Sequence, residues 1–410
     1  MIQLLSFACL VAFGTAQLLP GFTTFRADQR NSGVLDLNGT KVGREQWTLQ
    51  TNVLTGDMID NSAVIGKNGD LFFAISKILF CVSKEGKVKW KHKSPGLFLQ
   101  STASLTEDAL YILGSNYDWG SDRDNAIVMS INPSTGQVLW QHTLKYGGIY
   151  GSLNILQNGN IVAVFDGYHL VAFSPSGEEL WDYKDLGDYN PNSSIEENTP
   201  AVADDGSIIY GAKDGVLRSV SSEGALQWAL QITPFHSFTS PSIGEDGNIY
   251  ISVDEGTGYT YNASVYCVSA EGEVVWHYVA LAEYAVRELT SSIYHNGNVY
   301  VIMDSYLYSL RDGEMMWRYH FYDPVAGSLT AWNVPVITRN NMMYVGAFFW
   351  MYGFDISGTE KATDPPPISF MYKAITYGAS TLGWGPIPTV DTDGNVYFGT
   401  YSTMNALGGR

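Results

Sequence analysis

Residues 130–140 read SINPSTGQVLW, and the spacing of the glycine and the tryptophan in this stretch recurs along the chain. A gap of four residues separates the two at Gly43–Trp47, Gly86–Trp90, Gly136–Trp140, Gly177–Trp181, Gly224–Trp228, Gly272–Trp276 and Gly313–Trp317. Successive tryptophans lie 43, 50, 41, 47, 48 and 41 residues apart. A period of this length is typical of one four-stranded propeller blade per repeat.

The repeats also share a hairpin turn. Asn-Gly or Asp-Gly pairs stand at 68–69, 158–159, 205–206, 246–247, 296–297 and 393–394. These pairs suit turns with positive φ, which cost glycine nothing and cost asparagine or aspartate little. Short apolar strands with turns every 8–12 residues indicate all-β structure. For the same reason we assign Asp391–Asn395 to such a turn and not to a calcium loop, which needs a different glycine position.

The two ends of the chain determine the number of blades. Six complete repeats end at tryptophans, and a seventh is expected from Val334 to about Ala362, which stands four residues after Gly358 in place of a tryptophan. An eighth begins near Pro388 and has no tryptophan strand of its own. We expect residues 43–50 to supply that strand beside residues 395–407. The prediction is an all-β, eight-bladed β-propeller of four-stranded antiparallel blades, closed by an N-terminal strand without unpaired edges.

Residues 130–140 resemble the tryptophan-docking repeat of quinoprotein (PQQ-like) propellers, and FRADQRNSG at 25–33 resembles the segment that often opens them. The resemblance covers roughly residues 22–410. It implies that the seven tryptophans form a structural girdle between blades. The family includes PQQ-dependent dehydrogenases, which often have a vicinal disulfide and a calcium ion beside a catalytic aspartate. This chain has no adjacent cysteine pair, and its residues do not match the calcium site, so no cofactor is expected; PQQ with calcium stays an alternative.

The net charge limits the classes of partner, and the N-terminal sequence indicates the cellular compartment. The net charge is −18, with 23 basic and 41 acidic residues, which argues against nucleic acid and anionic membranes as partners. The apolar run Leu4–Phe13, followed by Gly14-Thr15-Ala16, predicts a signal peptide over 1–16 and one propeller domain over 17–410. We expect a secreted, extracellular protein without a membrane span, glycosylated at the sequons of Asn38, Asn192 and Asn262.

Cys81 and Cys267 occupy the same position in their repeats, nine residues before a tryptophan. Sister repeats have the small residues Ser130, Ala172, Ser219 and Ser309 there. Such a position indicates a tight, buried strand site. Blades one and five face each other across an eight-bladed ring, and a disulfide needs Cα atoms within about 7 Å. We therefore predict that the two thiols stay free.

The connections between blades carry the candidate ligand face. Several are long and aromatic, and we select Tyr150, His236, Arg287, Trp332 and Trp384. Aromatic rings around a funnel suit peptides, sugars or small molecules; alternatively, these side chains only pack the loops onto the ring. The histidines have no metal-site spacing, no metal site is predicted, and catalytic residues stay unassigned.

Three functional interpretations remain. The first is a secreted, non-catalytic binding or scaffold propeller whose protein, glycan or small-molecule ligand lies at the aromatic loop face or in the central channel. The second is a PQQ-dependent oxidoreductase of the extracellular or periplasmic space. The third is a protein similar to the bacterial outer-membrane assembly lipoprotein, against which the lack of a lipid-acceptor cysteine after the expected signal peptide counts.

Overall fold

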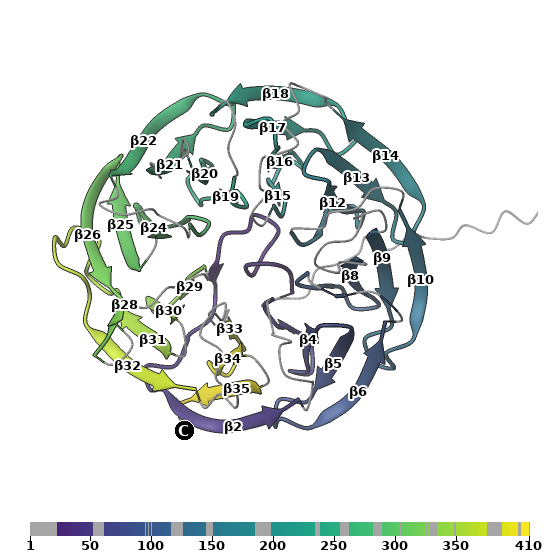
Figure 1. The fold of residues 1–410 in the computed structure, drawn as a ribbon, viewed down its shortest axis with the longest axis horizontal. Helices are drawn as coiled ribbons and strands as arrows, with labels where there is room; N and C mark the ends of the chain where they lie inside the picture. The colour runs from purple at the N-terminus through teal and green to yellow at the C-terminus, as the bar shows by residue number, and fades with distance from the viewer. Residues whose placement is uncertain are drawn as a thin grey trace, which may run out of the picture.

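The chain forms a ring of β-sheets around a central axis (Figure 1). The computed structural model describes residues 23–51, 61–94, 96, 98–99, 101–115, 126–144, 151–184, 198–233, 238–254, 262–281, 289–303, 305–324, 327–328, 334–347, 350–374, 388–400 and 403–409. Within these residues, seven sheets have four strands and one has five. The predicted eight-bladed β-propeller is confirmed.

Blades 1 to 4 follow one another along the chain, each with its first strand nearest the axis. Their strands are β3 (Val64–Ile65), β4 (Leu71–Ile75), β5 (Ile78–Val82) and β6 (Val88–Lys93); β7 (Ser104–Leu105), β8 (Leu110–Ser115), β9 (Ala126–Ile131) and β10 (Val138–Thr143); β11 (Asn154–Ile155), β12 (Ile161–Phe165), β13 (His169–Phe173) and β14 (Glu179–Lys184); β15 (Ala201–Val202), β16 (Ile208–Gly211), β17 (Val216–Val220) and β18 (Leu226–Gln231).

Blades 5 to 8 complete the ring, and blades 7 and 8 each include a strand from the N-terminal region. The strands are β19 (Ser242–Ile243), β20 (Ile249–Asp254), β21 (Asn262–Val268) and β22 (Val274–Leu281); β23 (Ile293–His295), β24 (Asn298–Met303), β25 (Tyr306–Arg311) and β26 (Glu314–His320); β1 (Val34–Leu35), β29 (Val336–Thr338), β30 (Met342–Ala347), β31 (Trp350–Asp355) and β32 (Ile368–Lys373); β33 (Thr389–Val390), β34 (Val396–Gly399), β35 (Thr403–Gly408) and β2 (Arg44–Gln50). A small hairpin, β27 (Tyr322–Asp323) and β28 (Gly327–Ser328), follows blade 6.

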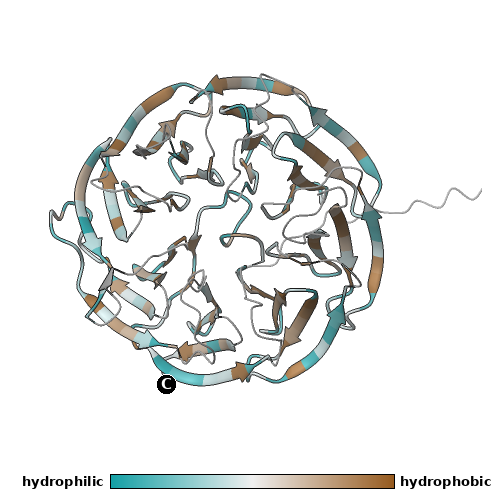
Figure 2. Ribbon diagram, in the orientation of Figure 1, coloured by the Kyte–Doolittle hydropathy of each residue, from teal (hydrophilic) through white to brown (hydrophobic). Residues whose placement is uncertain are grey.

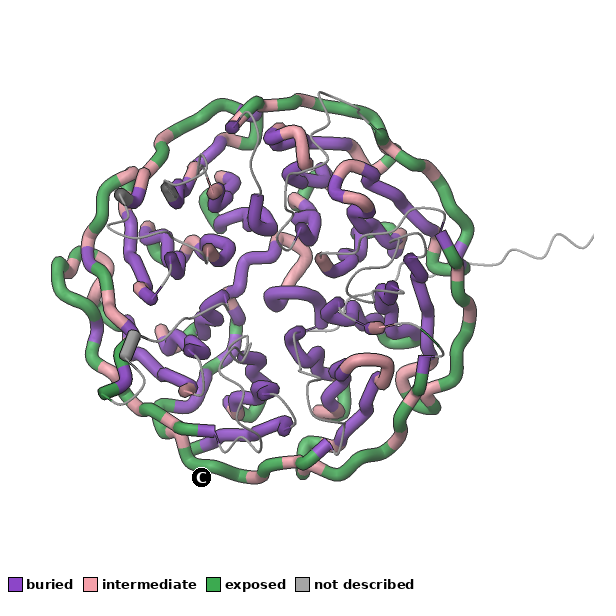
Figure 3. Tube along the Cα trace, in the orientation of Figure 1, coloured by how far each residue is buried: buried purple, intermediate pink, exposed green. Residues whose placement is uncertain are grey.

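The burial of each strand follows from its place in the blade. The two middle strands are covered on both faces by neighbouring blades, so β12 (IVAVF) and β13 (HLVAF) are buried throughout. The outer strand is covered on one face only, so β14 (ELWDYK) alternates between exposed and half-buried residues. Figures 2 and 3 show the same division around the ring: apolar, buried strands inside and a mixed, exposed rim outside.

Five tryptophans of the repeat pack closely on a turn glycine of the next blade. An ideal Cβ placed on the turn glycine of the following blade would lie 2.7 Å from the indole, as for Gly86 against Trp47, so only glycine allows this contact. The same glycine has a positive φ of 82°. The indole Nε1 of Trp47 also donates to the carbonyl of Lys84 at 2.8 Å. The 2.7 Å approach recurs at Gly136, Gly177, Gly224 and Gly272.

A second set of inter-blade contacts lies near the axis and joins blades 1 to 5. The backbone N–H of Ser62 donates to Thr102 Oγ1 (3.1 Å), that of Thr102 to Ser152 Oγ (2.9 Å), that of Ser152 to Thr199 Oγ1 (2.8 Å), and that of Thr199 to Ser240 Oγ (2.8 Å). These bonds run from blade 1 to blade 5 and give partners to buried backbone donors where the inner strands begin.

The ring closes as predicted. β2 pairs antiparallel with β35, from Arg44 opposite Gly408 to Gln50 opposite Thr403, and becomes the outer strand of blade 8. In Figure 1 the purple β2 lies beside the yellow β35. Trp47 stands opposite Ala406, just as Trp140 stands opposite Ser130 in blade 2. The N-terminal strand thus supplies the tryptophan that the eighth repeat lacks.

Blade 7 corrects one expectation. Ala362 does not fill the tryptophan position. Phe370 of β32 fills it: this residue lies opposite Gly353 of β31 and packs against Gly43. The connection between β31 and β32 runs through three consecutive prolines, 365–367, which cannot donate strand hydrogen bonds. The last strand therefore starts later than the fixed gap of four residues predicts.

The inter-blade indoles predict a stability ranking. Trp228 is half-buried, and its Nε1 donates to the carbonyl of Ala270 at 2.8 Å. Trp228→Ala removes the ring packing and this bond, and should lower the free energy of unfolding by about 3 kcal/mol. Tyr322→Ala, at a site 55% exposed, should change it by less than about 0.5 kcal/mol. Urea unfolding of both variants measures the difference; equal losses would contradict a structural role for the girdle.

Cys81 and Cys267 are free and buried, as predicted. Cys81 lies opposite Trp90, and Cys267 lies opposite Trp276, in the small-residue position of the third strand. Burial raises the pKa of each thiol to about 12. The thiolate is the reactive form of cysteine, so these groups are poor nucleophiles near neutral pH.

Alkylation tests this environment. Because the raised pKa leaves little thiolate at pH 8, iodoacetamide should leave the folded protein unmodified over a time in which urea-unfolded protein takes up a label at both Cys81 and Cys267. Intact mass, measured without a reducing agent, gives the number of labels. Rapid labelling of the folded chain, or a disulfide-linked pair in the unfolded one, would contradict the assignment.

Candidate functional site

The predicted ligand face lies outside the described residues: this holds for Tyr150, His236, Arg287, Trp332 and Trp384. The sequon residue Asn192 lies outside them too. Asn38 is exposed, and Asn262 begins β21 opposite Leu281. For these sites the sequence-based expectations stay predictions.

Parts of the aromatic connections are described, and they divide into two kinds. Phe238 is 3% exposed and packs against Gly211, where an added Cβ would lie 2.6 Å from its ring. Phe321 is fully buried against Tyr352, with ring centroids 5.1 Å apart. Tyr322, the next residue, is 55% exposed. The described aromatic side chains therefore include two that pack onto the ring and one that is exposed, and the ligand-face interpretation stays a prediction.

The centre of the ring holds the chain's own N-terminal residues 23–35, called the axial segment below (Figure 1). Its carbonyls accept hydrogen bonds from backbone N–H groups of inner strands in four blades. The pairs are Leu105 to Thr23 (2.7 Å), Val202 to Gln29 (2.7 Å), Ile243 to Arg30 (2.9 Å) and Ile337 to Gly33 (2.8 Å). The segment ends as β1, which pairs in parallel with β29. At this level the chain itself occupies the central channel.

Side chains fix the axial segment to three further carbonyl positions. Arg26 is 2% exposed, and its Nη2 donates to the carbonyl of Ser292 at 2.8 Å. Asn31 Nδ2 donates to the carbonyls of Thr199 and Pro241, both at 3.1 Å. Arg26 and Asn31 have positive φ values of 56° and 53°. Non-glycine residues rarely adopt this conformation, which persists where surrounding contacts hold it.

Two charged side chains of the axial segment, Asp28 and Arg30, are partly exposed. Asp28 accepts hydrogen bonds from the N–H of Ser32 (3.0 Å) and from its hydroxyl (2.6 Å). Burial raises the pKa of Asp28 above its usual value, and these hydrogen bonds oppose the shift. Arg30 lies 3.9 Å from the Asp28 carboxylate, and its side chain remains 34% exposed. Arg30 thus reaches from the axis toward solvent.

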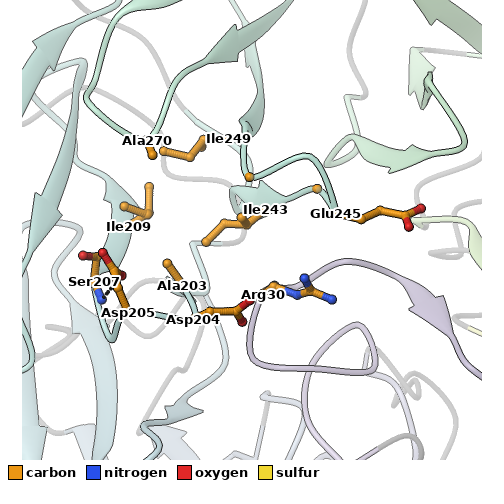
Figure 4. Close-up of a pocket in the computed structure, with 12 residues that line it drawn as sticks. Arg30, Ala203, Asp204, Asp205, Ser207, Ile209, Ile243, Glu245, Ile249 and Ala270 are labelled. Atoms are coloured by element: carbon orange, nitrogen blue, oxygen red, sulfur yellow. Dashed lines mark hydrogen bonds between the residues drawn. The ribbon is translucent and has the colours of Figure 1, made fainter.

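A pocket of about 230 Å³ opens beside Arg30, between blades 4 and 5 (Figure 4). Its floor is aliphatic: Ile209 and Ile249 are each 2% exposed, and Ile243 is 5% exposed. Ala270 lies at its edge, in the turn whose carbonyl receives the Trp228 indole. The volume is below the range of about 300–1,000 Å³ for drug-sized ligands. The pocket therefore has room for one long side chain.

The rim of the pocket is formed by hairpin turns that carry carboxylates. Asp204 and Asp205 belong to the first turn of blade 4, and Glu245 to the first turn of blade 5; all three are exposed. Asp205 also accepts a hydrogen bond from the N–H of Ser207 at 2.9 Å, which fixes its turn. Arg30 is the single basic residue among the residues that line the pocket. The site is aliphatic at its floor and negatively charged at its rim.

The pocket lies in an acidic part of this surface, which we call the turn face because it carries the turns between first and second and between third and fourth strands. In blades 4 and 5 these turns span 203–207, 221–225, 244–248 and 269–273. They hold seven carboxylates and no lysine or arginine: Asp204, Asp205, Glu223, Glu245, Asp246, Glu271 and Glu273. The equivalent turns of blade 1, 66–70 and 83–87, hold three lysines, Lys67, Lys84 and Lys87, beside two carboxylates, Asp70 and Glu85.

The described residues contain no group of three or more histidine, cysteine, aspartate or glutamate side chains placed to bind a metal ion. The Asp391 carboxylate is engaged by its own turn: it accepts hydrogen bonds from the N–H groups of Asp393 (2.9 Å) and Asn395 (2.8 Å). No helix in the described part of the chain is long and apolar enough to cross a bilayer.

Sequence reasoning missed both the axial segment and the pocket. The signal for the axial segment was the stretch at 25–33. It resembles the opening segment of PQQ-like propellers, but no structural role was assigned to it. The acidic turns were recognised only as hairpins. Their meeting at one pocket depends on the packing of blade 4 beside blade 5.

Comparison with known proteins agrees with this geometry. A family model described as outer membrane protein assembly factor BamB, of the PQQ_2 repeats, matches residues 31–278. A search of curated proteins finds no match. The crystal structure of BamB from Moraxella catarrhalis is similar, with 12% identity, a TM-score of 0.62, and coverage of 90% of this chain and 100% of that one.

Other solved structures match as well as that one. The C-terminal WD40 domain of Sif2 has 10% identity and a TM-score of 0.64, covering 90% of this chain and 99% of that one. The computationally designed Ika8 protein has 12% identity and a TM-score of 0.63, covering 89% and 99%. A natural assembly factor, a WD40 domain and a designed protein score alike, so this likeness shows the fold alone.

Proposed function

This chain belongs to the PQQ-like repeat propellers of the BamB family model, and we propose that it is a non-catalytic scaffold that binds a protein partner on the surface of its ring. The observation that carries the proposal is the axial segment. It fills the centre of the propeller with buried, hydrogen-bonded chain, which leaves the faces and the rim for a partner.

Two further features support a protein as the partner. The matching family model is described as an assembly factor for outer membrane proteins, and such a role requires protein contacts. The pocket on the turn face has room for one side chain, with an aliphatic floor and a charged rim. Protein interfaces commonly anchor on single side chains that fill such pockets. The aromatic loops around Tyr150, His236, Arg287, Trp332 and Trp384 stay a second candidate surface for the same partner.

We also propose that the protein acts outside the cytosol. The expected signal peptide over residues 1–16 and the three sequons motivate this placement. Asn38 is exposed, as a glycan acceptor must be. An extracellular setting also suits two buried thiols that need no reducing environment to stay unpaired.

Partner capture and a redox assay separate the scaffold from a quinoprotein oxidoreductase. The full chain, cross-linked in its native secretion, should retain a stoichiometric protein partner. Purified protein, supplied with PQQ and calcium, should not reduce an electron-accepting dye with alcohols or sugars as substrates. Quinone-dependent dye reduction in proportion to the protein would overturn the proposal, as would the absence of any stoichiometric partner after cross-linking.

A further inference from the structure

We infer that the pocket between blades 4 and 5 is the docking site for a lysine or arginine side chain from a basic segment of the partner protein. The inference rests on the proposed scaffold function and adds the chemistry of the contact. It starts from the shape of the pocket, an aliphatic recess at an inter-blade groove, and from the charge that surrounds it (Figure 4).

The floor and the rim together suit a long cationic side chain. Lysine and arginine bury their methylene stems along apolar surface while the charged head stays at a polar edge. Ile209, Ile243 and Ile249 provide the apolar surface. Asp204 and Glu245 provide the polar edge on two sides of it, from two different blades (Figure 4). An uncharged side chain would contact the apolar floor without pairing with the carboxylates, and a short cationic one would not reach both.

The charge of the turns around the pocket favours a partner segment with several basic residues. The turns of blades 4 and 5 on this face carry seven carboxylates and no basic residue. Arg30, the one cation at the pocket, lies 3.9 Å from Asp28, which partly offsets its charge. A partner with several basic residues is attracted to such a surface, and an acidic partner is repelled. Arg30 leaves the turns around the pocket with a net negative charge.

The neighbouring sites of the ring supply matched controls. Ala270 and Ser222 hold equivalent positions, because their carbonyls accept the indole N–H of Trp228 and Trp181. Only Ala270 lines the pocket. Glu245 and Glu107 likewise occupy equivalent turn positions in blades 5 and 2, and both are exposed. A substitution of Ala270 or Glu245 tests the pocket. The same substitution of Ser222 or Glu107 measures the effect of the changed side chain elsewhere on the ring.

The probe is a fluorescein-labelled peptide of alternating lysine and glycine, with a second version in which every lysine is acetylated. Fluorescence anisotropy should show saturable binding of the first and none of the second, because acetylation removes the charge. Ala270→Phe, which fills the recess, should weaken binding at least about tenfold, while Ser222→Phe leaves it unchanged. Asp204→Asn combined with Glu245→Gln should weaken it at least about fivefold, and Glu107→Gln should not.

Several outcomes would overturn the inference. Equal binding by Ala270→Phe and the parent protein would show a diffuse charge effect without a pocket. Equal losses in the Asp204→Asn/Glu245→Gln double variant and in the Glu107→Gln variant would show the same. Asp204→Asn and Glu245→Gln keep the side-chain volumes, and they leave unchanged Asp205, whose carboxylate holds its turn. This double variant therefore tests the pocket even if Ala270→Phe fails to fold.

The same variants separate this inference from the scaffold function. If cross-linked Ala270→Phe protein retains the partner as well as the parent does, the scaffold stands and the pocket inference fails. If neither protein retains a partner, the scaffold proposal itself fails, whatever the peptide does. Loss of the partner in Ala270→Phe, with retention in Ser222→Phe, supports both.

Discussion

The packing of an indole on a turn glycine is the contact on which the ring depends. In the described part of the chain, adjacent blades share no backbone ladder, so each interface needs side chains to hold two sheets face to face. The tryptophans do this at the outer rim, where an added Cβ on Gly136 would lie 2.7 Å from the Trp90 ring. Hydroxyl groups such as Thr102 Oγ1 do it at the axis. Two contacts at different radii fix both the spacing and the angle between blades.

A ring of this kind has one interface that must join the two chain ends, and here the N-terminal region contributes twice. β2 completes blade 8 at the rim, while the axial segment joins the inner strands of blades 2 to 7 at the centre. These contacts make the N-terminal residues part of the core. The chain's own axial segment therefore lies at the centre of the ring, and the inter-blade pocket lies on the turn face.

The sequence predicted what depends on local spacing. The Gly–Trp gap, the Asp-Gly and Asn-Gly turns and the small residue at Cys81 and Cys267 led to the blade number, the ring closure and the free thiols. It did not predict Phe370 as the indole substitute, because a longer connection breaks the spacing in blade 7. Nor did it predict the pocket, which joins residues 30, 204 and 245 through the angle between blades. No local sequence pattern encodes the angle between two blades.

The most direct test of this account is native-state hydrogen exchange at the amides that bond to the axial segment. Leu105, Val202, Ile243 and Ile337 donate to its carbonyls. If the segment is a fixed part of the core, these four amides should exchange only with global unfolding, as slowly as the amides of β12. Exchange of the four amides by local opening, while β12 stays protected, would show that the segment leaves the channel, and would contradict a filled centre as the basis of the proposed function.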